Sequence, residues 1–187
     1  LLHLGDIVDK AESPDDMLNK LSSVVAKMNQ GSGKTFMIHG NHDNNFSGQN
    51  GLVIEAQLKN IVDRDNLSNM TSYHDSGAYE VSDTTNKITL FFLNSFDHPS
   101  TVQGTNDFLR YGFGTSQIQW LQTRLTSVPD NHKVLFFSHN GFSGSSTIGD
   151  PDTTIRNQGA LRKLIESFNQ STNVTITQTN ISNNPEY

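Results

Sequence analysis

The tetrapeptide Gly40-Asn41-His42-Asp43 is the most informative stretch of this sequence, and it follows an apolar segment at residues 35–39 that is typical of a strand. Turns after strands favour Gly, Asn and Asp, but turn formation does not require a histidine between Asn and Asp. Amide oxygens, imidazole nitrogens and carboxylates are all ligands for divalent cations. The stretch therefore predicts a polar site at the end of a strand rather than a simple turn.

Two other segments place possible ligands directly after an apolar strand, at residues 5–9 and 138–140. In open α/β sheets, ligands bind beyond the carboxyl ends of the strands, so we expect Asp6, Asn41 and His139 to converge. Asp6 offers two oxygens that can bridge two cations, and Asn41 offers a neutral oxygen. His139 offers an imidazole nitrogen that suits Mn, Fe, Zn or Ni. The order of the three features favours a metal site.

Each of these residues also has a simpler interpretation when it is taken singly. A Gly-Asp pair after a strand is commonly a turn, which would account for Asp6. A buried histidine such as His139 is more often a hydrogen-bonded part of the core than a ligand. His42 projects differently from its neighbour and could face a substrate, while Asp43 could hold His42 in position as carboxylates near metal sites do.

Periodicity along the chain predicts alternating strands and helices. Ser13 can cap a helix, Pro14 suits its first turn, and Gly31 and Gly33 end it. We expect strands at residues 1–5, 35–39, 78–82, 87–94, 133–138 and 174–178, and helices at 13–28, 52–61, 116–125 and 154–168. The strand at residues 1–5 is expected to be buried. This order predicts one α/β layered domain of mixed strand pairing over residues 1–187.

Composition excludes several classes of protein. The net charge of −6 makes a preformed basic surface for nucleic acid improbable, and the absence of cysteine excludes disulfides and thiolate metal sites. No signal peptide and no run of 18 apolar residues is present, so we expect no membrane span. The low charged fraction of 17% leans towards an extracellular or virion protein, with a cytoplasmic one as the alternative. Oligomeric state stays open.

The segments Gly5-Asp6-Ile7-Val8-Asp9 and Gly40-Asn41-His42-Asp43, together with the strand-borne His139, resemble the calcineurin-like metallophosphoesterase superfamily, whose patterns are GDxxD and GNHD or GNHE. Residues 116–121 also look like the family's helix before the strand of His139. The resemblance implies a layered α-β-β-α sandwich and two divalent metal ions (Mn, Fe, Zn or Ni). It also implies hydrolysis of phosphomonoesters or phosphodiesters by a metal-activated hydroxide.

By the same resemblance, the matching residues take the roles of the family's site. Asp6 would bridge the two metals, and Asn41 and His139 would hold the second metal. His42 would stabilise the transition state or protonate the leaving oxygen, with Asp43 orienting it.

Asp9 would support the metal ligands without binding a metal itself, by the same resemblance. Two family motifs, Asp-x-His before GDxxD and Gly-His-x-His after the last strand, are not found in these 187 residues. We therefore expect a fragment of the domain that is truncated at both ends. Two alternatives follow from this expectation: a catalytically incomplete phosphoesterase-like binding or structural module, and a one-metal site that binds phosphate weakly.

Overall fold

The computed structural model describes residues 1–43, 57, 70–73 (backbone only), 76–97, 112–141, 155 and 157–171. Its elements, in chain order, are β1 (Leu2–Leu4), α1 (Pro14–Met28), β2 (Phe36–Ile38), β3 (Met70–Tyr73), β4 (Tyr79–Asp83), β5 (Ile88–Leu93), α3 (Thr115–Leu125), β6 (Lys133–Ser138) and α5 (Gln158–Asn169). The mixed α/β class predicted from the sequence is confirmed. The expected strand at 174–178 lies outside the described residues. So does the expected helix at 52–61, apart from residue 57.

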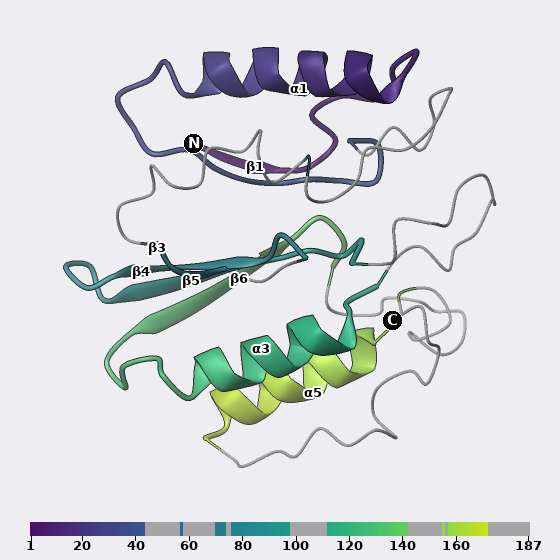
Figure 1. The fold of residues 1–187 in the computed structure, drawn as a ribbon. Coiled ribbons are helices and arrows are strands. Elements are labelled where there is room, and N and C mark those ends of the chain that lie inside the picture. The colour runs from purple at the N-terminus through teal and green to yellow at the C-terminus, as the bar shows by residue number, and fades with distance from the viewer. Residues whose placement is uncertain are drawn as a thin grey trace.

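The strands form two sheets. β1 and β2 pair in parallel, and the second sheet has the order β3-β4-β5-β6, in which only β5 and β6 are parallel. Figure 1 shows α1 beside the two-stranded sheet, and α3 and α5 together beside the four-stranded sheet. The complete layered sandwich of the metallophosphoesterase type, and a single domain over residues 1–187, stay predictions.

Helix α1 forms where the local sequence predicts it. Ser13 Oγ accepts a hydrogen bond from the Asp16 N–H at 3.1 Å, and Pro14 occupies the first turn. Its buried face consists of Met17, Leu21 and Val25, which recur at the three- to four-residue spacing of a helix. The capped helix start at Ser13 and Pro14 is therefore confirmed.

A buried tyrosine joins the two sheets. The hydroxyl of Tyr79 in β4 donates to the Met37 carbonyl oxygen of β2 at 2.8 Å and accepts from the Met37 N–H at 3.1 Å. The Tyr79 ring also stacks on Phe92 with ring centroids 4.5 Å apart. This side chain therefore supplies both apolar burial and the hydrogen bonds that backbone groups of β2 require.

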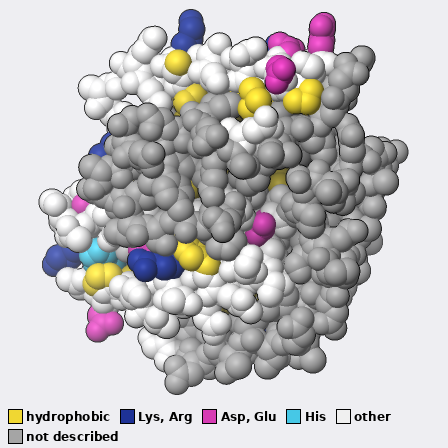
Figure 2. Space-filling view, in the orientation of Figure 1, with side chains coloured by type: hydrophobic (Ala, Val, Ile, Leu, Met, Phe, Trp, Pro, Cys, Tyr) yellow, Lys and Arg dark blue, Asp and Glu magenta, His cyan; other side chains and the backbone are white. Residues whose placement is uncertain are grey.

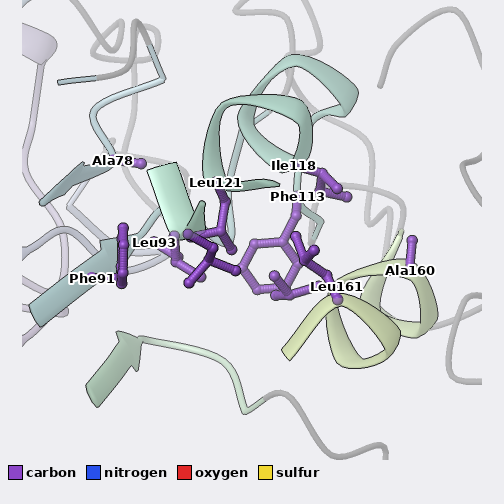
Figure 3. Close-up of a cluster of buried hydrophobic side chains, with 10 residues drawn as sticks. Ala78, Phe91, Leu93, Phe113, Ile118, Leu121, Ala160 and Leu161 are labelled. Atoms are coloured by element: carbon purple, nitrogen blue, oxygen red, sulfur yellow. The ribbon is translucent and has the colours of Figure 1, made fainter. Parts of the chain in front are cut away.

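The largest apolar cluster lies between the four-stranded sheet and the two helices α3 and α5. In Figure 3, Leu93, Phe113, Leu121 and Leu161 gather in this space. The buried face of α3 includes Ile118, Leu121 and Leu125. A salt bridge of 2.6 Å between Arg124 of α3 and the buried Glu80 of β4 adds a polar contact to the same interface.

Two expectations about the elements are wrong, and one strand was not predicted. β1 is not buried, because Leu2 and Leu4 are 42% and 39% exposed. β3 was not predicted, since its polar sequence lacks an apolar alternation and it forms by pairing with β4 across an irregular register. α5 begins at Gln158 rather than at residue 154, after Asn157 adopts a left-handed backbone with φ of 61°.

Charged side chains are spread over the face of the molecule that Figure 2 shows. In Figure 2, the Lys and Arg side chains lie in separate small groups, with acidic and hydrophobic side chains elsewhere on the same face. Within the described ranges, no helix is both long and apolar enough to cross a membrane.

Candidate metal centre

The ends of β1 and β2 meet in a contact that only glycine permits. A Cβ atom at Gly5 would collide with the Gly40 backbone, and a Cβ atom at Gly40 would collide with the carboxylate and backbone of Asp6. Gly5 also has φ of +96°, a conformation that side chains disfavour. The two glycines therefore bring Asp6 beside the segment that carries Asn41, as the sequence predicted for parallel strand ends.

The carboxylate of Asp6 is oriented by the next loop. Asp6 itself adopts φ of 54°, which Asp and Asn tolerate better than most residues. Its Oδ1 accepts the His42 N–H at 3.1 Å, and its Oδ2 lies 3.6 Å from His139 Nε2. One oxygen of Asp6 is thus bound to the backbone while the other faces His139.

His139 is held so that its Nε2 atom presents a lone pair. Its Nδ1 lies 2.7 Å from the Leu4 carbonyl oxygen, and a carbonyl can only accept, so Nδ1 carries a proton. In the neutral ring Nε2 is therefore an acceptor, and it lies 3.2 Å from Asn41 Oδ1. The atoms that face one another are His139 Nε2, Asn41 Oδ1 and Asp6 Oδ2, and all three are acceptors.

Three convergent acceptors fit a cation. Ligands bound at about 2.1 Å to one divalent ion lie roughly 3.0–3.5 Å from each other in octahedral or tetrahedral geometry, close to the separations found here. Among the described residues no group of three or more His, Cys, Asp and Glu side chains forms a metal site, and the amide of Asn41 takes the third place. The donor set therefore fits the second metal that the resemblance implies, and the role of Asp6 as a bridge to a first metal stays a prediction.

Asp43 lies beneath this site and is completely buried. Its Oδ2 accepts the Gly40 N–H at 2.7 Å, and its Oδ1 accepts the Val8 N–H at 2.9 Å. Burial raises the pKa of Asp43, and hydrogen bonds from the backbone of Gly40, Val8 and Ile7 oppose that rise. Asp43 thus ties the loops after β1 and β2 together, and its role in orienting His42 stays a prediction.

The carboxylate that contacts the His42 ring is that of Asp9. Asp9 Oδ1 lies 2.8 Å from His42 Nδ1, and the Asp9 carbonyl oxygen lies 3.0 Å from the same nitrogen. Both partners are acceptors, so Nδ1 carries the proton. The side chain of His42 is 31% exposed and can therefore meet a substrate. Sequence reasoning placed Asp9 near the site but not against His42.

A buried turn after β5 lies under His139. The sequence predicts Asp97 to be a solvated loop residue, with a place at the border of the site as the alternative. It is not solvated, because its Oδ2 accepts from the Gly114 N–H at 3.0 Å and from Gln117 Nε2 at 2.9 Å. Burial raises the pKa of Asp97 to about 6. The Phe96 ring lies 5.5 Å from the His139 ring. No local sequence signal distinguishes this turn from a surface loop.

Four further residues could bind a metal or line the site. His74, Asp75, His98 and Phe142 lie outside the described residues. Because His3 and His39 lie in predicted strands, the sequence predicts that they are packed or hydrogen-bonded rather than ligands. The His39 ring lies against Phe96, and His3 Nδ1 accepts the Gly5 N–H at 3.2 Å.

Comparison with known proteins identifies a family for the chain. No curated protein matches the chain. The family model described as calcineurin-like phosphoesterase matches residues 1–171 of the 187, and the chain therefore belongs to that family.

Proposed function

We propose that this protein hydrolyses phosphomonoesters or phosphodiesters at the site formed by Asp6, Asn41 and His139. The observation that supports this most directly is the convergence of three acceptor atoms at 3.2 and 3.6 Å, which a divalent cation would stabilise. Membership of the calcineurin-like phosphoesterases indicates a metal-dependent phosphoester hydrolase. The ion would be Mn, Fe, Zn or Ni, since the set mixes imidazole with oxygen ligands.

The proposal requires little rearrangement of the side chains that would bind the metals. Asp6 would be shared between two cations, and Asn41 with His139 would complete the second position. Bound cations in such sites neutralise phosphate oxygens and lower the pKa of the attacking water. Because Leu4 accepts the Nδ1 proton of His139, the imidazole needs no rearrangement to offer Nε2.

His42 would transfer the proton that the leaving group needs. As water adds to phosphorus, the bond to the leaving oxygen breaks and negative charge develops on that oxygen. Protonated His42 Nε2 would donate its proton to this oxygen, releasing an alcohol. The Asp9 carboxylate, 2.8 Å from Nδ1, would hold the ring and stabilise the imidazolium form before transfer.

Two alanine substitutions test these assignments with alkyl phosphomonoesters and phosphodiesters in the presence of Mn²⁺, because an alkoxide leaving group needs a proton. We expect His42→Ala to lower kcat about 10²–10⁴-fold, the range for loss of a general acid. Asn41→Ala should weaken Mn²⁺ binding and lower turnover at subsaturating metal.

Matched controls are His132→Ala, whose ring contacts the Thr89 hydroxyl at the start of β5, and Asn19→Ala, which is exposed on α1. Full turnover in His42→Ala and Asn41→Ala would overturn the proposed roles. Equal losses in the controls would show that the effect is one of folding.

A further inference from the structure

Phe96 lies behind the proposed metal site and is 5% exposed. Its ring centroid is 5.5 Å from that of His139 and 6.1 Å from that of His39, with interplanar angles of 53° and 44°. His139 follows β6 and His39 follows β2, so this one ring contacts two of the three strand ends that carry the proposed metal ligands. Phe96 itself follows β5 and forms an isolated bridge with Gly112.

Buried hydrogen bonds fix the backbone of Phe96. Its N–H donates to Asn94 Oδ1 at 2.8 Å, and Asn94 Nδ2 donates to the Ser76 carbonyl oxygen at 2.6 Å. Gln117 of α3 closes the network, because its Oε1 accepts the Asn94 N–H and its Nε2 donates to the Asn94 carbonyl oxygen, both at 2.9 Å. The position of the Phe96 ring is thus set by the sheet and α3 rather than by the metal site.

The contact with Phe96 restricts the tilt of the His139 ring, which the hydrogen bond of His139 does not. The bond from Nδ1 to the Leu4 carbonyl fixes one atom of the imidazole, but the ring can still tilt about that atom. A tilt would move Nε2 away from Asn41 Oδ1. A tilted aromatic ring packed at 5.5 Å opposes this motion through close contact.

We propose that Phe96 is a positioning residue that fixes the plane of the His139 ring and so directs Nε2 to the metal. The inference rests on the proposed metal site and adds to it a residue that carries no ligand atom. Partners that orient metal ligands typically change metal affinity by about 10–100-fold when they are removed. For an apolar contact we expect the lower end, about tenfold weaker binding in Phe96→Leu.

The control is Phe91→Leu, which removes an equal volume from a fully buried ring on the opposite face of the sheet, against Trp120. Both variants should lose thermal stability in the absence of metal. Co²⁺ titrations followed by visible absorption measure affinity and ligand geometry in the full-length protein. We expect weaker Co²⁺ binding and an altered absorption band in Phe96→Leu, and values within about twofold of wild type in Phe91→Leu.

A second measurement does not require metal. Imidazole ¹⁵N spectra of the metal-free protein report the tautomer of His139, which should be the Nδ1–H form in wild type and Phe91→Leu. In Phe96→Leu we expect a mixture of tautomers.

Unchanged Co²⁺ affinity together with an unchanged His139 tautomer in Phe96→Leu would overturn the inference while leaving the proposed function intact. Absence of Co²⁺ binding in wild type would instead overturn the proposed function. The His139 tautomer would still decide whether Phe96 orders the ring.

Discussion

His139 Nε2 lies 3.2 Å from Asn41 Oδ1, although 98 positions separate the two residues in the chain. In the neutral ring neither atom can donate, because the Leu4 carbonyl holds the proton of His139 on Nδ1. Two facing acceptors repel each other unless a proton or a cation lies between them. A cation bound between these atoms, as proposed above, would remove this repulsion.

Metal binding should consequently stabilise the fold. At a free Mn²⁺ concentration 100 times the dissociation constant, we expect a gain of about 2.7 kcal/mol in the free energy of unfolding. Thermal unfolding with Mn²⁺ and with chelator measures the difference. His139→Ala should abolish most of the shift. An identical shift in that variant would mean that Mn²⁺ binds elsewhere.

Asp9 should matter most for substrates with poor leaving groups. Asp9→Asn removes the carboxylate that lies 2.8 Å from His42 Nδ1, and we expect kcat to fall about 10–100-fold on an alkyl phosphate ester. An activated aryl ester needs little protonation of its leaving oxygen, so its turnover should change much less. Steady-state rates on both esters make the comparison. Equal losses on both would contradict a role for Asp9 in supporting proton transfer.

The buried carboxyl of Asp97 should make stability depend on pH. Burial raises its pKa from 3.8 to about 6, so the folded state holds a proton that the unfolded state has released between these values. Its contribution to the free energy of unfolding is therefore largest below about pH 4, falls as the pH rises to 6 and is lost above that, with a total change of roughly 3 kcal/mol. Denaturant unfolding at pH 4 and pH 7 follows the change.

Asp97→Asn isolates this contribution, because the amide keeps an oxygen to accept from Gly114 and Gln117 but does not titrate. The free energy of unfolding of the variant relative to wild type should rise from pH 4 to pH 7. A constant difference would contradict the raised pKa of Asp97.

The hydroxyl of Tyr79 should contribute more to the free energy of unfolding than an average hydrogen bond does. Tyr79→Phe keeps the ring but leaves both the N–H and the carbonyl of Met37 without this buried partner. We expect a loss of about 1–3 kcal/mol in the free energy of unfolding, the penalty for unsatisfied buried polar groups. Urea unfolding measures the loss. A loss below about 0.5 kcal/mol would show that water replaces the hydroxyl.

The contact at Gly40 can be tested against another glycine. Gly40→Ala places a methyl group on the Asp6 carboxylate, whereas Gly33→Ala meets no atom within 4 Å. We expect Gly40→Ala to lose about 1–3 kcal/mol of stability and to weaken Mn²⁺ binding, because Asp6 must move. Gly33→Ala should leave both nearly unchanged. Mn²⁺ affinity equal to wild type in Gly40→Ala would show that Asp6 is not a ligand.

Local signals allowed much of the fold to be predicted. α1 follows from Ser13, Pro14 and an apolar face, and β5 and β6 follow from short apolar runs, because capping and periodicity act within one or two turns. β3 could not be predicted, since it depends on pairing with β4. The exposure of β1 also escaped prediction, because burial depends on what covers a strand.

For the site, the sequence by itself determined that the proposed ligands Asp6, Asn41 and His139 follow strands. Only the tertiary structure decided their mutual geometry, since parallel strand ends separated by long stretches of chain must first be brought together. It also decided that Asp9 contacts the His42 ring and that Phe96 packs behind His139. Such contacts leave no local signature, because any loop residue of suitable size can make them once the fold places it there.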